Sequence, residues 1–420
     1  MIHHGDLFDV LPTLPAESID AGVMDPPYDL TANKPGGSGI ASVNLDSPYG
    51  RARIGSGNGA GGFMGKAWDG TGVAFKPETW REVLRVLKPG AYLCAFGGTR
   101  TFHRMTVAIE DAGFEIRDCL SWLYGQGFPK SLNIGDGRGT ALKPSWEPIV
   151  LARKPFNVSV AANIDRHGTG ALNIDACRIA FANDDDKAAA AAAAAQRTSH
   201  VGLNGSSTFQ RTGDVKASID GYVNRMDMGR WPANVLLDEE SAGMLDEQTG
   251  ELQSGGTPAV RYADKFRNTF GTFKGGDTED GIGGSRGGAS RFYYVAKPSR
   301  EERDFGCSNL TPRSGGEATD RKDGSAGLQN PRAGAGRTGG ARNIHPTVKP
   351  VELMRWLVRL VTPLNGIVLD PFTGSGTTGM ACRYEQREFI GIEREAEYVA
   401  IAERRIAAVA PLFAVSEETA

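Results

Sequence analysis

The chain has 420 residues, 40% of them hydrophobic, and a formal net charge of −3. The length allows roughly two or three domains, and the composition is that of a soluble globular protein with a sizeable core. No basic and apolar leader opens the sequence and no run of about eighteen apolar residues occurs, which excludes a membrane span and predicts a cytoplasmic enzyme.

The five cysteines are scattered, without a C-x-x-C pair and without matching histidines. This spacing argues against a disulfide framework and against a zinc site, so we expect no structural metal.

The first part of the chain predicts two strands that each end at an acidic residue. Gly5-Asp6-Leu7-Phe8 closes a short strand, and the apolar run Ile19–Met24 predicts a buried strand closed by Asp25-Pro26-Pro27-Tyr28. In open α/β sheets, ligands bind at the carboxyl ends of strands. We therefore expect this tetrapeptide to contribute to a binding site.

The chemistry of the tetrapeptide suits a planar group that bears an amine. The two prolines have no N–H groups, so the rigid backbone presents only carbonyl acceptors beside a carboxylate and an aromatic ring. Asp25 and the Pro26 carbonyl can each accept one amine proton while the Tyr28 ring stacks on the plane. The nitrogen lone pair then points at an electrophile. A simple turn, with a capping Asp and a half-buried Tyr, remains the alternative.

Residues 31–74 are rich in glycine and show no periodicity. A loop of this length in a compact domain is typically a lid or is disordered. Because it directly follows the tetrapeptide, we interpret it as a lid over the amine site.

From residue 77 onward, helices and strands alternate, which predicts a wound α/β sheet. Pro77 marks a helix first turn and Lys88-Pro89-Gly90 marks its end. The further predicted elements are a strand at 91–96, a helix over 100–112, and strands near 114–122 and 148–153.

In residues 155–340 the alternation of helices and strands gives way to polar, glycine-rich sequence. The alanine run 188–195 predicts either a short helix or a low-complexity linker. Between residues 281 and 342, eleven Lys and Arg residues stand against six Asp and Glu residues. This local basic excess is compatible with a surface that follows nucleic-acid phosphates, and equally with a solvated loop.

After residue 340 the sequence again predicts alternating strands and helices, here around a glycine-rich loop. The strand at 367–370 runs into Pro371-Phe372-Thr373-Gly374-Ser375-Gly376 and a helix from Thr377, and a strand ending at Glu393 follows. This arrangement is typical of a nucleotide-type site, where glycines allow close approach and an acid after the next strand holds ribose hydroxyls. No Lys-Ser or Lys-Thr pair follows the loop, which argues against a P-loop, and Asp370 favours a cationic ligand over pyrophosphate.

Four motifs together resemble one family. They are Asp25-Pro26-Pro27-Tyr28, His345-Pro346-Thr347-Val348-Lys349-Pro350, the loop 370–377, and Gly391-Ile392-Glu393. In these the chain resembles the amino-group (N6-adenine or N4-cytosine) DNA methyltransferases that use S-adenosylmethionine. The order, with the target-amine motif first and the cofactor loop last, is similar to that of the circularly permuted beta group. The stretches 127–131 and 143–148 also resemble sequence of this family, especially of its phage and prophage members, without a definite role.

The resemblance implies a Rossmann-like α/β methyltransferase sheet with an inserted target-recognition region. Residues 1–154 would form the catalytic half, 155–340 the partly flexible insertion, and 341–420 the cofactor-binding half of the same sheet. The implied catalytic residues are Asp25, Pro26, Pro27 and Tyr28. The implied cofactor-binding residues are Asp6, Leu7, Lys349, Asp370, Phe372, Gly374, Ser375, Gly376, Thr377 and Glu393.

For some of these residues the resemblance implies a specific place. Asp6 would lie near the cofactor's adenine, although an N-cap is an equal alternative. Asp370 would lie near the methionine amine and Lys349 near its carboxylate. Phe372 would pack on the cofactor or beneath it.

The implied activity is methyl transfer to the N6 amine of an adenine flipped out of duplex DNA. The alternatives are N4-cytosine, or an RNA or protein-amide substrate. A non-enzymatic DNA-binding subunit is disfavoured because the acids at 25, 370 and 393 are all present. The sequence leaves open a homodimer and a separate restriction endonuclease as partner.

Overall fold

The computed structural model describes residues 1–29, 71–125, 133–191, 228–254, 285–296, 301–313 and 342–409. Most of the predicted lid, including residues 31–70, lies outside these ranges. The chain forms two compact units: the first comprises Met1–Asn173 and Ala296–Ala420, and the second comprises Ile174–Val295. The predicted insertion at 155–340 thus includes residues 155–173 and 301–313, which group with the first unit.

A mixed sheet forms the centre of the first unit. Its seven described strands lie in the order β1 (Ile2–His4), β13 (Glu388–Glu393), β12 (Ile367–Asp370), β2 (Ile19–Met24), β3 (Leu87–Phe96), β7 (Trp146–Arg153) and β4 (Glu115–Leu123). The first five are parallel, and β7 is antiparallel to both of its neighbours. The predicted Rossmann-like α/β sheet is therefore confirmed.

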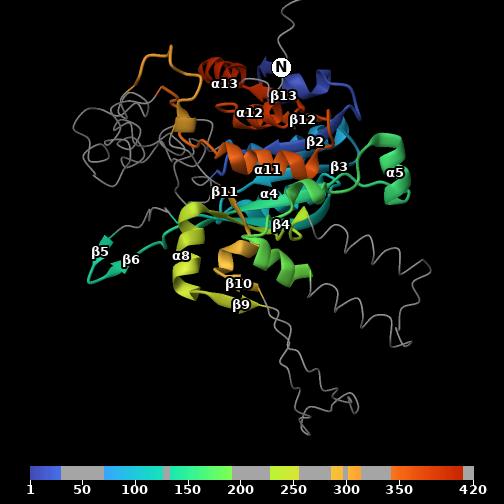
Figure 1. The fold of residues 1–420 in the computed structure, drawn as a ribbon. Helices are drawn as coiled ribbons and strands as arrows, with labels where there is room; N and C mark the ends of the chain where they lie inside the picture. The colour runs from blue at the N-terminus through green and yellow to red at the C-terminus, as the bar shows by residue number, and fades with distance from the viewer. Residues whose placement is uncertain are drawn as a thin grey trace, which may run out of the picture. The chain divides into compact units, whose positions relative to one another are not determined.

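The two ends of the chain meet in the middle of this sheet. β2 from the N-terminal part pairs in parallel with β12 from the C-terminal part, with Ala21 opposite Val368 (Figure 1). The chain continues from β12 to β13 on one side and from β2 to β3 on the other. Such a reversal of direction opens a crevice at the carboxyl ends of the two strands, where α/β proteins bind ligands. Asp370 ends β12, and Asp25 directly follows β2.

The described helices of the first unit are α1 (Leu7–Val10), α3 (Pro77–Val86), α4 (Phe102–Asp111), α5 (Val160–His167), α11 (Val351–Val361), α12 (Thr377–Tyr384) and α13 (Ala396–Ala408). The helices predicted to begin at Pro77, over 100–112 and from Thr377 are present as α3, α4 and α12, whereas α1 and α5 were not predicted. Trp80 of α3 and Met105 of α4 pack in one core with Leu93 and Ala95 of β3. Alternate residues of a strand point to opposite faces, so these two helices cover one face of β3.

One boundary differs from the prediction. The 88–90 stretch was expected to lie outside the strand, yet β3 already begins at Leu87, which pairs with Ile19. Gly90 has a φ of 80° and donates its N–H to Lys154. A left-handed glycine lets the strand bend here without losing its neighbours.

Shorter elements complete the first unit. They are the 3-10 helices η1 (Leu11–Thr13), η4 (Val73–Phe75) and η8 (Glu301–Arg303), and the hairpin of β5 (Asn133–Gly135) with β6 (Arg138–Gly139).

The second unit is built around a buried ion pair. Asp186 is 1% exposed and contacts both Arg230 and Arg291. The Arg230 guanidinium lies 4.8 Å from the ring centroid of Phe181 and 5.0 Å from that of Phe292. Residues 184–191 are helical, so the first four alanines of the 188–195 run belong to a helix and the rest lie outside the described residues.

Besides the helix at 184–191, the described residues of the second unit contain further regular elements. They are η5 (Asp175–Cys177), β8 (Val235–Asp238), α8 (Glu239–Thr249), β9 (Leu252–Ser254), β10 (Ser285–Gly287), η7 (Ala289–Phe292) and β11 (Tyr294–Ala296), which reaches one residue into the first unit.

Candidate active site

A cavity of about 1270 Å³ opens at the carboxyl ends of β2 and β12. Ligand pockets usually measure about 300–1,000 Å³, so this cavity has room for more than one small molecule. It is lined by the tetrapeptide 25–28, by the glycine loop and by Glu393. All the predicted site residues line it except Gly376.

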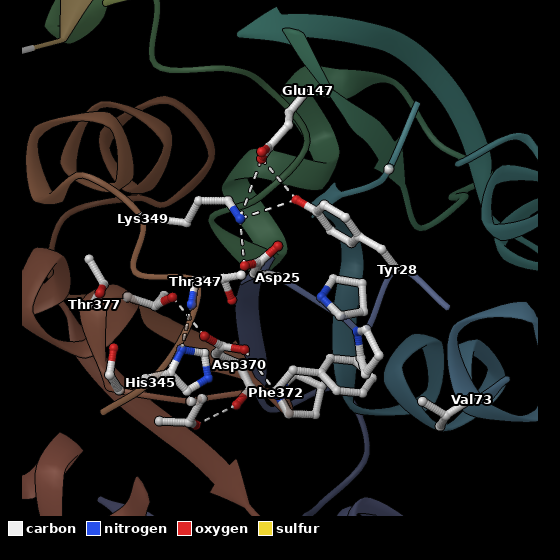
Figure 2. A pocket seen from close by; sticks show the side chains of 18 of the residues that line it. Asp25, Tyr28, Val73, Glu147, His345, Thr347, Lys349, Asp370, Phe372 and Thr377 are labelled. Atoms are coloured by element: carbon white, nitrogen blue, oxygen red, sulfur yellow. Dashed lines mark hydrogen bonds and ion pairs between the residues drawn. The ribbon is translucent and has the colours of Figure 1, made fainter. Parts of the chain in front are cut away.

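Four polar side chains form a connected cluster on one wall of the cavity (Figure 2). The Lys349 Nζ lies 2.6 Å from Asp25 Oδ2, 3.1 Å from the Tyr28 hydroxyl and 3.4 Å from Glu147 Oε2. The Tyr28 hydroxyl donates to Glu147 Oε2 at 2.9 Å. Asp25 follows β2, Glu147 belongs to β7 and Lys349 precedes α11, so the sheet and one helix start hold the cluster together.

Burial shapes the charges of this cluster. It raises the pKa of Asp25, although the Lys349 ammonium beside it acts in the opposite direction. Burial lowers the pKa of Lys349, but the carboxylates of Asp25 and Glu147 more than reverse this and the pKa rises. Burial, with both carboxylates, raises the pKa of Tyr28 well above its usual value. The lysine is therefore charged and the tyrosine keeps its proton at neutral pH.

One carboxylate oxygen of Asp25 is hydrogen-bonded and the other is not. Its Oδ2 accepts from Lys349, whereas its buried Oδ1 has no hydrogen-bond partner among the described residues. Buried polar atoms are nearly always paired, so an unpaired carboxylate oxygen in the wall of a cavity calls for a ligand that donates a hydrogen bond.

Tyr28 is fixed from two sides. Its backbone carbonyl accepts from the hydroxyl of Thr101, which is 2% exposed, at 2.7 Å, and its own hydroxyl is held by Glu147. The ring therefore has a defined orientation beside the cavity. Neither Thr101 nor Glu147 was among the predicted site residues. Glu147 lies in the stretch 143–148, which resembles sequence of the family but was given no definite role.

On the opposite side, the glycine loop is held by two acids, the buried Asp370 and the half-buried Glu393. Asp370 accepts from the Phe372 N–H at 3.0 Å and from the Thr378 hydroxyl at 2.6 Å, and burial raises its pKa to about 7. Glu393 accepts from the Gly374 N–H at 2.8 Å, and burial raises its pKa. Both acids thus shape the loop as well as facing the cavity.

The two predicted cofactor glycines have different roles. At Gly374, with a φ of 52°, an added Cβ would lie 2.8 Å from Nε2 of His345. At Gly376, with a φ of 79°, a Cβ would lie 2.8 Å from the Cβ of Ala402 on α13. Gly374 thus allows close approach at the cavity wall, whereas Gly376 serves the packing of the loop against a helix and does not line the cavity.

Behind the loop lies a buried arginine that the sequence did not point to. Arg405 of α13 is 0% exposed and donates to the Ser375 carbonyl at 2.6 Å, to the Thr377 hydroxyl at 3.1 Å and to the Glu302 carbonyl at 3.0 Å. Burial lowers its pKa to about 10, so it remains charged at neutral pH. The arginine fixes the glycine loop from the side that faces away from the cavity.

The remaining predicted residues take the following places. Asp6 is the N-cap of α1, accepting from the Phe8 N–H at 2.9 Å, and also lines the cavity, so the two expectations for it are compatible. Leu7 and Phe372 line the cavity and also pack on the core. Lys349 contacts Asp25 rather than the glycine loop, and a role for it in cofactor binding stays a prediction.

No described helix is both long and apolar enough to cross a membrane. Within the same residues, no group of three or more His, Cys, Asp or Glu side chains is arranged to hold a metal ion.

Two curated proteins match short parts of the chain. The type II methyltransferase M2.LlaDCHI of Lactococcus lactis subsp. cremoris is 45% identical over 62 residues, which make up 15% of this chain and 23% of that protein. The type II methyltransferase M2.MboI of Moraxella bovis is 41% identical over 69 residues, 16% of this chain and 25% of that protein. The matches therefore span about a quarter of these relatives.

Solved structures similar to this chain include two methyltransferases. The cytosine-N4-specific PvuII DNA methyltransferase is 15% identical with a TM-score of 0.42, covering 96% of this chain and 85% of its own. The M1.HpyAVI–SAM complex is 16% identical with a TM-score of 0.37, covering 96% and 98%.

A family profile described as DNA methylase, that of the N6/N4 amino-methyltransferases, matches residues 19–404. The match covers most of the chain and includes all four motifs, and the short strand β1 lies before it. The protein therefore belongs to the N6/N4 DNA methylase family.

Proposed function

We propose that the protein transfers a methyl group from S-adenosylmethionine to an exocyclic base amine in duplex DNA. The observation that carries this proposal is the unpaired Asp25 Oδ1 in the wall of a cavity that also contains the glycine loop. An amine donor and a nucleoside cofactor would meet there. Membership in the DNA methylase family supports the same reaction.

The residues around the glycine loop fit S-adenosylmethionine. This cofactor has a sulfonium and an amine, which are cationic, and ribose hydroxyls, which donate hydrogen bonds. The carboxylates of Asp6, Asp370 and Glu393 line the cavity and suit these groups, and Gly374 leaves its wall free of a Cβ. When bound, the cofactor supplies an electrophilic methyl group. We assign Glu393 to the ribose and Asp370 to the amine.

The tetrapeptide would hold the target base. Asp25 Oδ1 and the Pro26 carbonyl accept the two amine protons, and the Tyr28 ring stacks on the base. Stacking on an aromatic ring is worth roughly 1–3 kcal/mol per base, which partly offsets the few kcal/mol that base flipping costs. Positioning of the amine then accounts for most of the rate, because a direct displacement needs no enzyme nucleophile.

The target is more specifically adenine N6. An Asp at the first position of the tetrapeptide is similar to the N6-adenine members, whereas N4-cytosine members more often have Ser there. N4-cytosine is the second candidate, because the family profile that matches the chain covers both N6 and N4 methylases. The same proposal includes the beta-group order of the motifs, the similarity to phage members of the family, and the flipping of the target base out of the duplex.

DNA sequence recognition would fall to residues of the 155–340 region, which contains the basic excess at 281–342. A homodimer and a separate restriction endonuclease remain predictions.

The deciding experiment incubates the protein with methyl-labelled S-adenosylmethionine and unmethylated genomic DNA, digests the DNA to nucleosides and identifies the product by mass spectrometry. N6-methyladenine is the expected product. N4-methylcytosine would keep the reaction and correct the base. Intact cofactor binding without label in DNA would overturn the DNA substrate and redirect the test to RNA and protein amides.

A further inference from the structure

Glu147 is a second carboxylate beside Asp25 that none of the family motifs requires. It lies on β7, lines the same cavity and contacts the other side of Lys349. Asp25, Lys349 and Glu147 therefore form an uninterrupted row of charged groups, with Nζ 2.6 Å from one carboxylate and 3.4 Å from the other (Figure 2). Two carboxylates on one ammonium leave a net negative charge, which favours a proton entering the row.

We propose that Glu147 is the final acceptor of the proton that the target amine loses, and that this proton arrives from Asp25 through Lys349. The proposal rests on the proposed function, because it concerns the fate of a proton that only amine methylation releases. Glu147 touches neither the base nor the cofactor in this scheme and acts through Lys349.

The proton balance of the reaction requires such an acceptor. The amine nitrogen uses its lone pair to bond to the methyl carbon, while the electron pair of the carbon–sulfur bond stays with sulfur. The nitrogen is then cationic and becomes neutral when one N–H bond breaks and its proton bonds to Asp25 Oδ1. Asp25 is now neutral and cannot serve the next amine until it loses this proton.

Lys349 can transfer a proton from Asp25 to Glu147 while its own charge stays the same. A half-turn of the Asp25 carboxyl group, whose last torsion is soft, presents the new O–H to the lysine nitrogen. Lys349 gives one of its three protons to Glu147 Oε2 and accepts the proton of Asp25. The result is an ionised Asp25, a charged Lys349 and a neutral Glu147, with the same number of protons as before.

Two features of the site favour this route. The unpaired Asp25 Oδ1 is the oxygen that we assign to the bound base. Glu147 keeps 21% of its side-chain surface exposed, so water can reach it at the edge of the cavity. The Tyr28 hydroxyl lies 2.9 Å from Glu147 and 3.1 Å from Lys349, so it holds these two side chains in fixed positions relative to each other.

The rival explanation is that Glu147 only positions Tyr28 and Lys349. Glu147→Gln distinguishes the positioning role from the proton relay. The amide oxygen still accepts hydrogen bonds from Tyr28 and Lys349, but the side chain no longer takes up a proton. A matched control is Glu115→Gln on the adjacent β4, which removes a carboxylate paired with Arg153 at 2.6 Å but does not line the cavity.

The experiment measures kcat, the KM for S-adenosylmethionine, cofactor affinity by calorimetry, and base flipping by the fluorescence of 2-aminopurine at the target position. For Glu147→Gln we expect kcat to fall at least about tenfold, as for loss of a proton acceptor, with affinity and fluorescence within about twofold of the wild type. Glu115→Gln should match the wild type in all four.

Chemical rescue gives the second readout. In Glu147→Ala, added formate should restore part of the lost kcat because it can accept a proton, whereas formamide of similar size should not. Equal rescue by both, a normal kcat in Glu147→Gln, or a loss of cofactor affinity as large as the loss of kcat would each overturn the relay. Absence of DNA methylation by the wild-type protein would instead overturn the proposed function.

Discussion

Lys349 lies 2.6 Å from Asp25, although 324 residues separate the two in the chain. The contact joins a residue at the end of β2 to one just before α11, and it places a fixed cation beside the carboxylate that we assign to the target amine. Removing one partner of a buried ion pair usually costs more than the pair contributes, because the other charge is left uncompensated. The first two predictions concern this pair.

Asp25→Ala should abolish methyl transfer while leaving cofactor affinity within about tenfold of the wild type, because Asp25 faces the amine and the glycine loop is held by other residues. Activity on DNA and calorimetric titration with S-adenosylmethionine check this. Asp25→Asn, which keeps the shape of the side chain, is the matched control for folding. An equal loss of activity and affinity would contradict the division of the cavity into two sites.

Lys349→Met should move the rise of activity with pH to higher pH. The Lys349 ammonium acts to lower the pKa of Asp25, so without it that pKa rises further. If transfer requires an ionised Asp25, more alkaline conditions are then needed to ionise it. The pH profile of kcat/KM measures the shift, and Lys88→Met, which removes a lysine paired with Asp20 away from the cavity, should leave the profile unchanged.

Cofactor affinity should rise with pH up to about pH 7. Burial raises the pKa of Asp370 to about 7, so below this pH a cationic cofactor must displace a proton from it. The gain is at most about tenfold per pH unit, and it ends once Asp370 is already ionised in the free protein. Calorimetry between pH 5.5 and 7.5 tests it, and Asp370→Asn should bind more weakly with a flatter dependence.

Arg405→Met should loosen the glycine loop. The Ser375 and Glu302 carbonyls would lose their buried donor, and each unsatisfied group costs about 1–3 kcal/mol. We expect a lower Tm and a cofactor affinity weakened by roughly tenfold or more. Arg404→Met, at the exposed neighbouring position, is the control. Unchanged affinity in Arg405→Met would mean that the loop does not depend on this arginine.

The two loop glycines should fail in different ways when replaced by alanine. Gly374→Ala forces His345 to move at the cavity wall, so it should raise the KM for the cofactor. Gly376→Ala places its Cβ against Ala402 between loop and helix, so it should mainly lower the Tm. Measuring both quantities for both variants tests this contrast, which equal effects on KM would refute.

Much of the first unit was predictable because its signals are local. Hydrophobic periodicity and proline and glycine positions gave the order of strands and helices, and the motif at 25–28 and the loop at 370–377 were both placed at strand ends, where the structure has them. Both signals lie within a few residues of the feature that they predict.

The parts that were missed depend on distant partners. Glu147 becomes part of the site only because β7 brings it to Tyr28, 119 residues earlier in the chain. Position 376 requires glycine because a Cβ there would clash with Ala402 on α13. Arg405, which donates to the glycine loop, lies on the same helix. No local pattern in the sequence assigned these residues a role in the site.

The pairing of β2 with β12 also has a consequence for synthesis. The tetrapeptide 25–28 is present in the first 30 or so residues, but the glycine loop acquires its arginine support only after residue 405 has left the ribosome. Until residues 367–370 emerge, β2 also lacks its neighbour β12, so unfinished chains lack a complete site. A growing or truncated chain should therefore be unable to modify DNA, and activity should begin only with the last helix.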